Sequence, residues 1–167
     1  MIIKGLQDEV FGDYKKPAMY IAMPNCSFKC DKENGCKLCQ NSALAQEPNI
    51  FYPMLELVER YLNNPITSAI VIAGLEPFDS VDDVINLIFV LREIRHCNDD
   101  VVIYTGYTEE EIMEKYLHIY NRMVNYGNII IKFGRFRPGQ EPHYDEVLGI
   151  KLASDNQYAK RVNNERI

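Results

Sequence analysis

The sequence predicts an α/β protein built around an open, curved and mainly parallel sheet, a partial (βα) barrel. Four short apolar runs of strand length recur along the chain, at residues 18–23, 69–73, 101–104 and 129–131. Helical patterns separate successive runs, and such alternation favours right-handed crossovers between parallel strands. Four strands are too few for a closed barrel of eight units, so we expect the sheet to stay open.

The amino-terminal third contains an arm, a strand and a loop. Residues 1–16 alternate apolar and polar side chains around two glycines, which predicts a short hairpin or extended arm before the core. Residues 18–23 are apolar throughout, as in a strand covered on both faces. Residues 31–35 are polar and turn-forming, so we expect a loop between Cys30 and Cys36 rather than one helix that carries both.

The first long helix should begin after Pro53. Leu55, Val58 and Leu62 recur at helical spacing, and proline suits the first turn of a helix. We expect this helix to end near residues 63–65.

Two further helices have acidic first turns. Ser80 is the expected N-cap of a helix that reaches about His96, with aspartates at positions 82 and 83. Thr108 should cap the next helix, whose first turn holds three consecutive glutamates.

Length, composition and charge indicate one compact domain, residues 1–167. The chain is 47% hydrophobic and carries a formal charge of -6, which argues against nucleic acid as a partner. We interpret the basic residues Lys132, Arg135 and Arg137 as a solvated strand end rather than an anion-binding edge. There is no secretory pattern and no apolar run of the roughly 20 residues that span a bilayer, so we expect a cytoplasmic protein without a membrane partner.

Four of the five cysteines lie between positions 26 and 39, which indicates metal or redox chemistry rather than disulfides in a reducing compartment. Three kinds of site are possible from spacing alone. The pair Cys36 and Cys39 has the C-x2-C spacing of a structural zinc site. A conventional electron-transfer cluster would use four cysteines. A cluster held by three cysteines would leave one iron open for another ligand. Cys97 stands apart and should be structural.

Cys26 and Cys30, directly after a buried strand, resemble the start of the C-x3-C-x2-C signature of the radical S-adenosylmethionine (SAM) superfamily. Cys39 and Asn41 resemble the Cys-x-Asn of the enzymes that activate anaerobic ribonucleotide reductase. The resemblance implies a 4Fe-4S cluster held by Cys26, Cys30 and Cys39. Eight residues separate the last two cysteines where the family has two, and this insertion leaves Cys36 as an alternative third ligand.

Other segments match the same family in the same order. Residues 74–77 resemble its Gly-Gly-Glu-Pro motif, although Leu75 replaces the second glycine. Residues 104–107 resemble its Tyr-Thr-Gly-Tyr segment, and residues 134–136 its Gly-Arg-Phe. Residues 154–157 resemble its Ser-x-Asn-Gln, but Tyr158 stands where the family has arginine. The resemblance implies that the residues that bind SAM are Asn41, Gly74, Glu76, Pro77, Thr105, Gly106, Tyr107 and Asn156.

The resemblance also implies a function. The family cleaves SAM reductively to a 5'-deoxyadenosyl radical, and the related activating enzymes then install a glycyl radical on anaerobic ribonucleotide reductase. The expected partners are the large subunit of that reductase and a low-potential electron donor such as flavodoxin or ferredoxin. No catalytic residue beyond the cluster is expected, since His96, His118 and His143 form no obvious set. The alternatives are radical SAM chemistry on another protein or peptide, and a non-catalytic, zinc-stabilised binding module.

Overall fold

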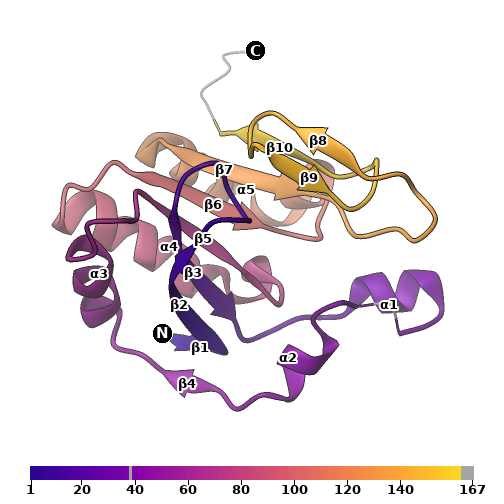
Figure 1. Ribbon diagram of the computed structural model, residues 1–167, viewed down its shortest axis with the longest axis horizontal. Helices are drawn as coiled ribbons and strands as arrows, with labels where there is room; N and C mark the ends of the chain where they lie inside the picture. Colours follow the sequence, from indigo (N-terminus) through magenta and orange to yellow (C-terminus); the bar gives the residue numbers. More distant parts are fainter. Residues whose placement is uncertain (38, 163–167) are drawn as a thin grey trace.

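The structure, a computed structural model, describes residues 1–37 and 39–162. Within this range a six-stranded sheet forms the centre, in the order β10-β7-β6-β5-β3-β2 (Figure 1). The bounds are β2 Gly5–Val10, β3 Ala18–Met23, β5 Ala69–Gly74, β6 Asp100–Tyr104, β7 Ile129–Phe133 and β10 Tyr158–Arg161. The inner pairings from β3 to β7 are parallel, and the edge strands β2 and β10 are antiparallel to their neighbours. The mixed α/β architecture and the mainly parallel sheet are as expected, and the curvature of a partial barrel stays a prediction.

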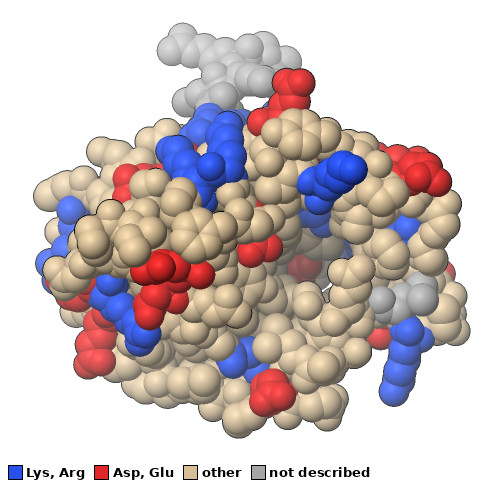
Figure 2. Space-filling view, in the orientation of Figure 1, with Lys and Arg blue, Asp and Glu red and all other residues tan. Residues whose placement is uncertain are grey.

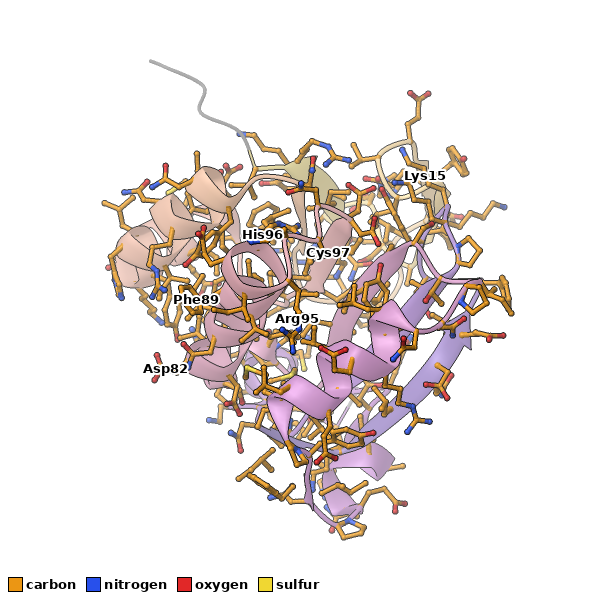
Figure 3. All side chains as sticks on the ribbon, turned by 90° about the vertical axis from the view of Figure 1, so that its left-hand side faces the viewer. Lys15, Asp82, Phe89, Arg95, His96 and Cys97 are labelled. Atoms are coloured by element: carbon orange, nitrogen blue, oxygen red, sulfur yellow. The ribbon has the colours of Figure 1, made fainter. Side chains whose placement is uncertain are left out.

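One face of the sheet packs against helices (Figure 3). These are α3 Met54–Leu62, α4 Val81–Phe89, its π-helical continuation η2 Val90–Ile94, and α5 Glu109–Tyr126. The core between sheet and helices contains Met19, Ile21, Ile70, Ile72, Ile103, Ile131, Leu57, Val84, Ile88, Ile112 and Met123. Side chains alternate along a strand, so this face takes every second residue and leaves the others for the opposite face.

The opposite face is covered near one end of the strands by elements that the sequence pattern did not indicate. They are Tyr14 and a hairpin of β8 His143–Asp145 and β9 Ile150–Leu152. Leu148 and Leu152 pack there against Val71 and Ile130. The other end of this face, at the carboxyl ends of the parallel strands, is left for a pocket.

The amino-terminal segment, for which a short hairpin or extended arm before the core was expected, joins the main sheet. β2 is an edge strand of the main sheet and pairs with β3, while β1 Ile2–Ile3 pairs with β4 Ile50–Phe51. Tyr14, only 2% exposed, closes the segment by a hydrogen bond to Asp100. The alternation of residues 1–16 therefore reflects pairing with the core sheet itself.

The helix after Pro53 forms as predicted, and its buried face is offset from the apolar residues that indicated it. The helix buries Leu57, Val58 and Tyr61, whereas Leu55 and Leu62 are 52% and 40% exposed. The helical spacing was read correctly. The side of the helix that carries Leu57, Val58 and Tyr61 faces the core, because tertiary packing decides which part of an apolar stripe is covered.

The capping predictions differ in outcome. Thr108 forms a capping box with Glu111, as expected. Ser80 stands before α4 but makes no side-chain cap, and its hydroxyl accepts a hydrogen bond from Asn25 instead. A short 3-10 helix, η1 Pro77–Ser80, precedes α4, and the helical run ends with η2 at Ile94, two residues before the predicted end near His96.

The expected loop after Cys30 is partly helical, which corrects the sequence prediction. α1 Lys29–Asn34 includes Cys30 and ends at Gly35, whose φ of 67° favours glycine. Cys36 lies beyond this helix, so the two cysteines do not share it. Leu38, the last residue of the insertion, lies outside the described residues. α2 Ser42–Gln46 follows. In the part of the chain that is described, no helix combines the length and hydropathy needed to cross a bilayer.

Candidate iron-sulfur site

A pocket of about 440 Å³ opens at the carboxyl ends of β3, β5, β6 and β7. Figure 2 shows the molecule hollowed between the β8–β9 hairpin and the segment that contains α1 and α2. The volume lies in the range of small-molecule and cofactor pockets, roughly 300–1,000 Å³. Its walls include the predicted residues Cys26, Cys30, Cys39, Asn41, Gly74, Glu76, Thr105, Gly106 and Tyr107. Pro77, Asn156 and Cys36 are not among its lining residues.

The backbone on either side of Cys26 is held by hydrogen bonds to residues that follow β5. Glu76 donates its backbone N–H to the carbonyl oxygen of Asn25 at 2.7 Å, and the N–H of Ser27 donates to Asp79 Oδ2 at 2.6 Å. Both neighbours of Cys26 are therefore fixed to the turn after β5. Asp79 was not identified from the sequence, where its position five residues after Gly74 was the only signal.

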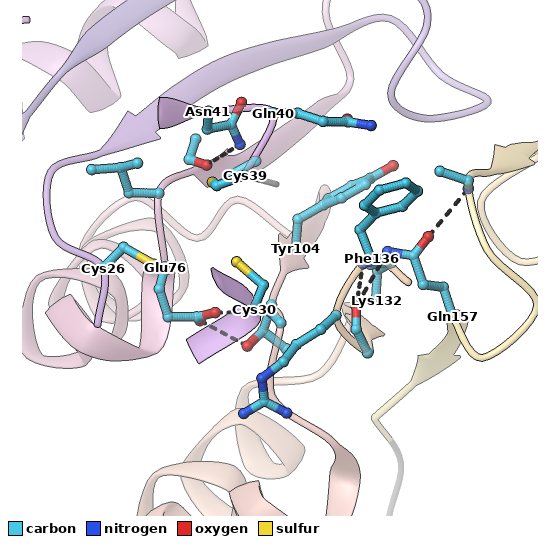
Figure 4. Close-up of a pocket in the computed structure, with 18 of the residues that line it drawn as sticks. Cys26, Cys30, Cys39, Gln40, Asn41, Glu76, Tyr104, Lys132, Phe136 and Gln157 are labelled. Carbon is cyan, nitrogen blue, oxygen red and sulfur yellow. Dashed lines mark hydrogen bonds between the residues drawn. The ribbon is translucent and has the colours of Figure 1, made fainter. Parts of the chain in front are cut away.

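Cys30 and Cys39 are brought together by Asp31. The backbone N–H of Cys39 donates to Asp31 Oδ1 at 2.9 Å, and the thiol of Cys30 lies 3.9 Å from the same oxygen. Figure 4 shows the side chains of Cys26, Cys30 and Cys39 directed into one space. Cys36 is exposed.

Two thiols of the pocket, those of Cys26 and Cys30, have raised pKa values. Burial is the main cause that raises the pKa of Cys26 to about 11, and the carboxylates of Glu76 and Asp79 act in the same direction. Burial, followed by the neighbouring Cys39, raises the pKa of Cys30. Binding of a metal centre must therefore displace these protons.

Asn41 connects the cysteine segment to β5. Its side-chain amide donates to the carbonyl oxygen of Gly74. Gly74 has a φ of 84°, and a Cβ at this position would lie 2.8 Å from the Cα of Ala22. Only glycine therefore allows β5 to end so close to β3, and the segment after Cys39 is anchored at that point.

Glu76 locks the ends of β5 and β6 together. Its carboxylate accepts hydrogen bonds from the Thr105 hydroxyl at 2.7 Å, the Gly106 N–H at 2.8 Å and the Phe78 N–H at 3.0 Å. It is 7% exposed, and burial raises its pKa to about 7 although these bonds oppose the shift. Pro77 follows as the first residue of η1.

The donor set fits an iron-sulfur cluster. Cysteine thiolates are the usual ligands of such clusters, and three of them line one pocket here. Among residues 1–37 and 39–162, no three His, Cys, Asp or Glu side chains converge on a point where they could hold a single metal ion. A preformed four-thiol zinc site is thus not seen in the described residues.

Comparison with known families gives the same chemistry. Residues 17–158, which include all four clustered cysteines, match the family of 4Fe-4S single cluster domains. The chain belongs to this family. No curated protein and no solved structure gives a significant match. Membership makes the chain an iron-sulfur protein and argues against the zinc alternative.

In this 4Fe-4S domain Tyr107 is packed rather than open. Its side chain is almost buried, its hydroxyl donates to Asp79 Oδ1 at 2.8 Å, and its ring meets Phe78 and Tyr116. The ammonium of Lys29 lies 4.5 Å from the ring centroid. A ring held on several sides can form a wall of the pocket but has little face left for stacking a base.

Arg135 and Glu111 connect the turn after β7 to the first turn of α5 and, through Lys29, to α1. Arg135 donates to both carboxylate oxygens of Glu111, at 2.9 and 2.8 Å, and Lys29 contacts the same carboxylate. Burial acts to raise the pKa of Glu111, but the bond from Arg135 and the cap of α5 outweigh it and lower the pKa to about 2. The capping box revealed Glu111 in the sequence, but its partner on another element could not be predicted.

Lys132 contradicts the expectation of a solvated strand end. It is 7% exposed, lines the pocket and donates to the carbonyl oxygen of Gly134 at 2.7 Å. Burial lowers its pKa to about 8, and the charge of Glu76 opposes this shift. Arg135 is paired, and only Arg137 of the three basic residues is exposed as expected.

The carboxyl-terminal motif supports the turn after β7. Asn156 donates to the carbonyl oxygen of Arg135, and Gln157 donates to that of Gly134. Asn156 therefore acts behind the pocket wall. The histidines lie apart: His96 is exposed in the segment after η2, His118 is exposed on α5, and His143 lies on β8.

Proposed function

We propose that this iron-sulfur protein is a radical SAM enzyme that installs a glycyl radical on anaerobic ribonucleotide reductase. In this proposal Cys26, Cys30 and Cys39 ligate three irons of a 4Fe-4S cluster. One observation carries the proposal: three clustered cysteines line the pocket, while the fourth, Cys36, is exposed outside it. Three thiolates leave one iron free for SAM, whereas an electron-transfer cluster would use four.

A 4Fe-4S cluster held by these cysteines would supply one electron to SAM. Reductive cleavage of the bond between the sulfonium sulfur and the 5'-carbon would then give methionine and a 5'-deoxyadenosyl radical. That radical would take a hydrogen atom from a glycine Cα of the partner and so give 5'-deoxyadenosine and a glycyl radical. The protein supplies binding, orientation and exclusion of water.

The pocket residues have distinct parts in this proposal. Gly74 and Asn41 keep the cysteine segment against the end of β5. Glu76 has three donors already, so we assign it to fixing Thr105 and Gly106 in the wall beside SAM. Asn156 acts indirectly, through the carbonyl oxygen of Arg135. The sheet would be open and curved, with SAM across its carboxyl edge.

Reconstitution under anaerobic conditions tests the cofactor. We expect about four irons and four sulfides per chain, as in a 4Fe-4S centre, and formation of 5'-deoxyadenosine that depends on SAM and dithionite. Cys30→Ala should abolish both the cluster and SAM cleavage, because it removes a ligand. The matched control is Cys36→Ala, which should retain both. Zinc in a colourless protein, or cleavage by Cys30→Ala, would overturn the proposal.

The partner needs a separate experiment. The reconstituted enzyme, a reductant such as reduced flavodoxin, and the large subunit of anaerobic ribonucleotide reductase should give a glycyl radical signal by electron paramagnetic resonance. If SAM is cleaved but the reductase gains no radical, the chain acts on another protein or peptide. The SAM chemistry would then stand and the named partner would not.

A further inference from the structure

Because of the insertion between Cys30 and Cys39, two cysteines, Cys36 and Cys39, could bind the third iron of the cluster. Five residues separate Cys30 from Cys36, and eight separate it from Cys39. The entropic cost of closing a flexible loop of n residues grows as about (3/2)RT ln n. The probability of closure therefore falls with about the 3/2 power of n, and chain statistics favour Cys36 by about two-fold. Cys36 is also exposed and free of a disulfide. Some feature of the fold must favour Cys39.

Asp31 is placed to provide that preference. It lies in the first turn of α1, directly after Cys30. Its Oδ1 accepts the backbone N–H of Cys39 at 2.9 Å and lies 3.9 Å from the sulfur of Cys30. One carboxylate oxygen thus contacts both Cys39 and Cys30, the cysteines on either side of the insertion.

The rest of the segment agrees with this arrangement. Gly35 ends α1 in a left-handed conformation with φ 67°, which turns the chain before Cys36. Two residues after Cys39, Asn41 is bound to the carbonyl oxygen of Gly74. Cys39 is therefore held from both sides, by Asp31 and by the anchor on β5, while Cys36 is exposed and does not line the pocket.

We infer that Asp31 is a positioning residue that selects Cys39 over Cys36 as the third cluster ligand. It acts through its acceptor oxygen and not as a ligand. This inference rests on the cluster ligands of the proposed function but does not depend on SAM cleavage or on the partner.

Differential alkylation of the holoprotein tests the inference. Thiols bound to iron are protected, and the modified cysteines are identified by mass spectrometry after the cluster is removed. In the wild-type protein Cys36 should react while Cys39 is protected. In Asp31→Ala the protection should shift from Cys39 towards Cys36 by about five-fold, the scale of one lost backbone hydrogen bond. Asp31→Asn keeps an acceptor oxygen and should behave as wild type.

The control is Glu33→Ala, which removes a carboxylate from the same helix. Glu33 is 55% exposed and pairs with Arg135 at 3.5 Å, without a contact to either cysteine among the interactions seen. It should leave the protection pattern unchanged. Unshifted protection of Cys39 in Asp31→Ala would overturn the inference, and so would an equal shift in Asp31→Asn.

A second measurement applies if Asp31→Ala binds no iron. In the apoprotein, dibromobimane joins thiols that lie close together. It should link Cys30 to Cys39 in the wild type and in Asp31→Asn, and link Cys30 to Cys36 more often in Asp31→Ala. An unchanged ratio overturns the inference. Reaction of Cys26 and Cys30 in the iron-loaded wild type would instead refute the ligand set of the proposed function.

Discussion

Two buried carboxylates at opposite ends of the sheet have opposite electrostatic settings. Asp100, at the amino end of β6, is bound by the Tyr14 hydroxyl at 2.9 Å, by Lys16 at 2.6 Å and by Arg161 at 2.9 Å. Burial acts to raise its pKa, but these bonds outweigh burial and lower it. Glu76, at the carboxyl end of β5, is bound by two backbone N–H groups and a hydroxyl, and its pKa rises to about 7.

The two ends of the sheet therefore differ in what their charges do: ion pairs stabilise the amino end, and the carboxyl end forms the pocket. At Asp100 two cations join the amino-terminal segment and β10 to the sheet, so charge contributes to stability there. At Glu76 the hydrogen-bond donors are neutral, and an ionised carboxylate costs free energy. Such a cost is tolerated at a pocket, where the site needs rigid strand ends more than it needs ion pairs.

Gly74→Ala should have the largest effect and tests how rigid the pocket end is. The new Cβ would meet the Ala22 backbone at 2.8 Å, in a conformation with φ 84°. We expect a loss of about 4 kcal/mol in the free energy of unfolding, measured by denaturant titration of the apoprotein. Gly12→Ala is the control, since a Cβ there meets nothing within 4 Å. Equal stability of the two variants would show that the backbone around Gly74 shifts at little cost in free energy to admit a Cβ.

Asp100→Ala should have the second largest effect on stability, because it removes the ion pairs at the amino end of the sheet. It orphans the buried hydroxyl of Tyr14 and releases Lys16 and Arg161, whose side chains are 44% and 36% exposed. We expect a loss of about 3 kcal/mol, below the upper range for buried pairs because both cations reach water. Iron content after reconstitution should stay unchanged, because the pocket is at the other end. Loss of the cluster would contradict the separation of the two ends.

The pH dependence of stability sharpens the comparison further. The folded pKa of Glu76 lies above the value of 4.5 that it has when unfolded, so its penalty is absent below pH 4.5 and grows as the pH rises towards 7. Glu76→Gln should remove this loss, which is about 3 kcal/mol for a shift from 4.5 to about 7. The measurement is the difference in unfolding free energy between wild type and variant at pH 4.5 and pH 7.5. A constant difference would refute the raised pKa.

Asp100 supplies the opposite sign for the same measurement. Its folded pKa lies below the unfolded value of 3.8, so its contribution is present above pH 3.8 and is lost as the pH falls below it. The difference between wild type and Asp100→Asn should therefore shrink on acidification. If both variants respond alike, the electrostatic contrast between the two ends does not exist.

Cys36→Ala should have the smallest effect. The side chain is exposed and lies outside the pocket, so stability should change by less than about 0.5 kcal/mol. Iron and sulfide per chain, measured after reconstitution, should equal those of the wild type. A loss of one iron or more would make Cys36 a ligand and reverse the assignment of the third thiol.

Much of the local structure could be predicted from the sequence. The four parallel strands are continuous apolar runs, a pattern that is local and independent of partners. The capping box of Thr108 and Glu111 is likewise a local interaction. Features that depend on contacts with other elements could not be predicted in this way: the edge pairing of β2, the exposure of Leu55 and Leu62, the helix α1 and the burial of Lys132.

The sequence by itself determined the alternation of strands and helices and placed thiols at the carboxyl end of the first parallel strand, because periodicity and ligand chemistry reside in the residues themselves. The tertiary structure alone decided which cysteines share the pocket. Cys36 and Cys39 are equally good ligands as residues, and the contacts of Asp31 and Asn41 bring one of them to the sheet. Hydrogen bonds between residues far apart in the chain have no signature in local spacing, so only the folded chain reveals them.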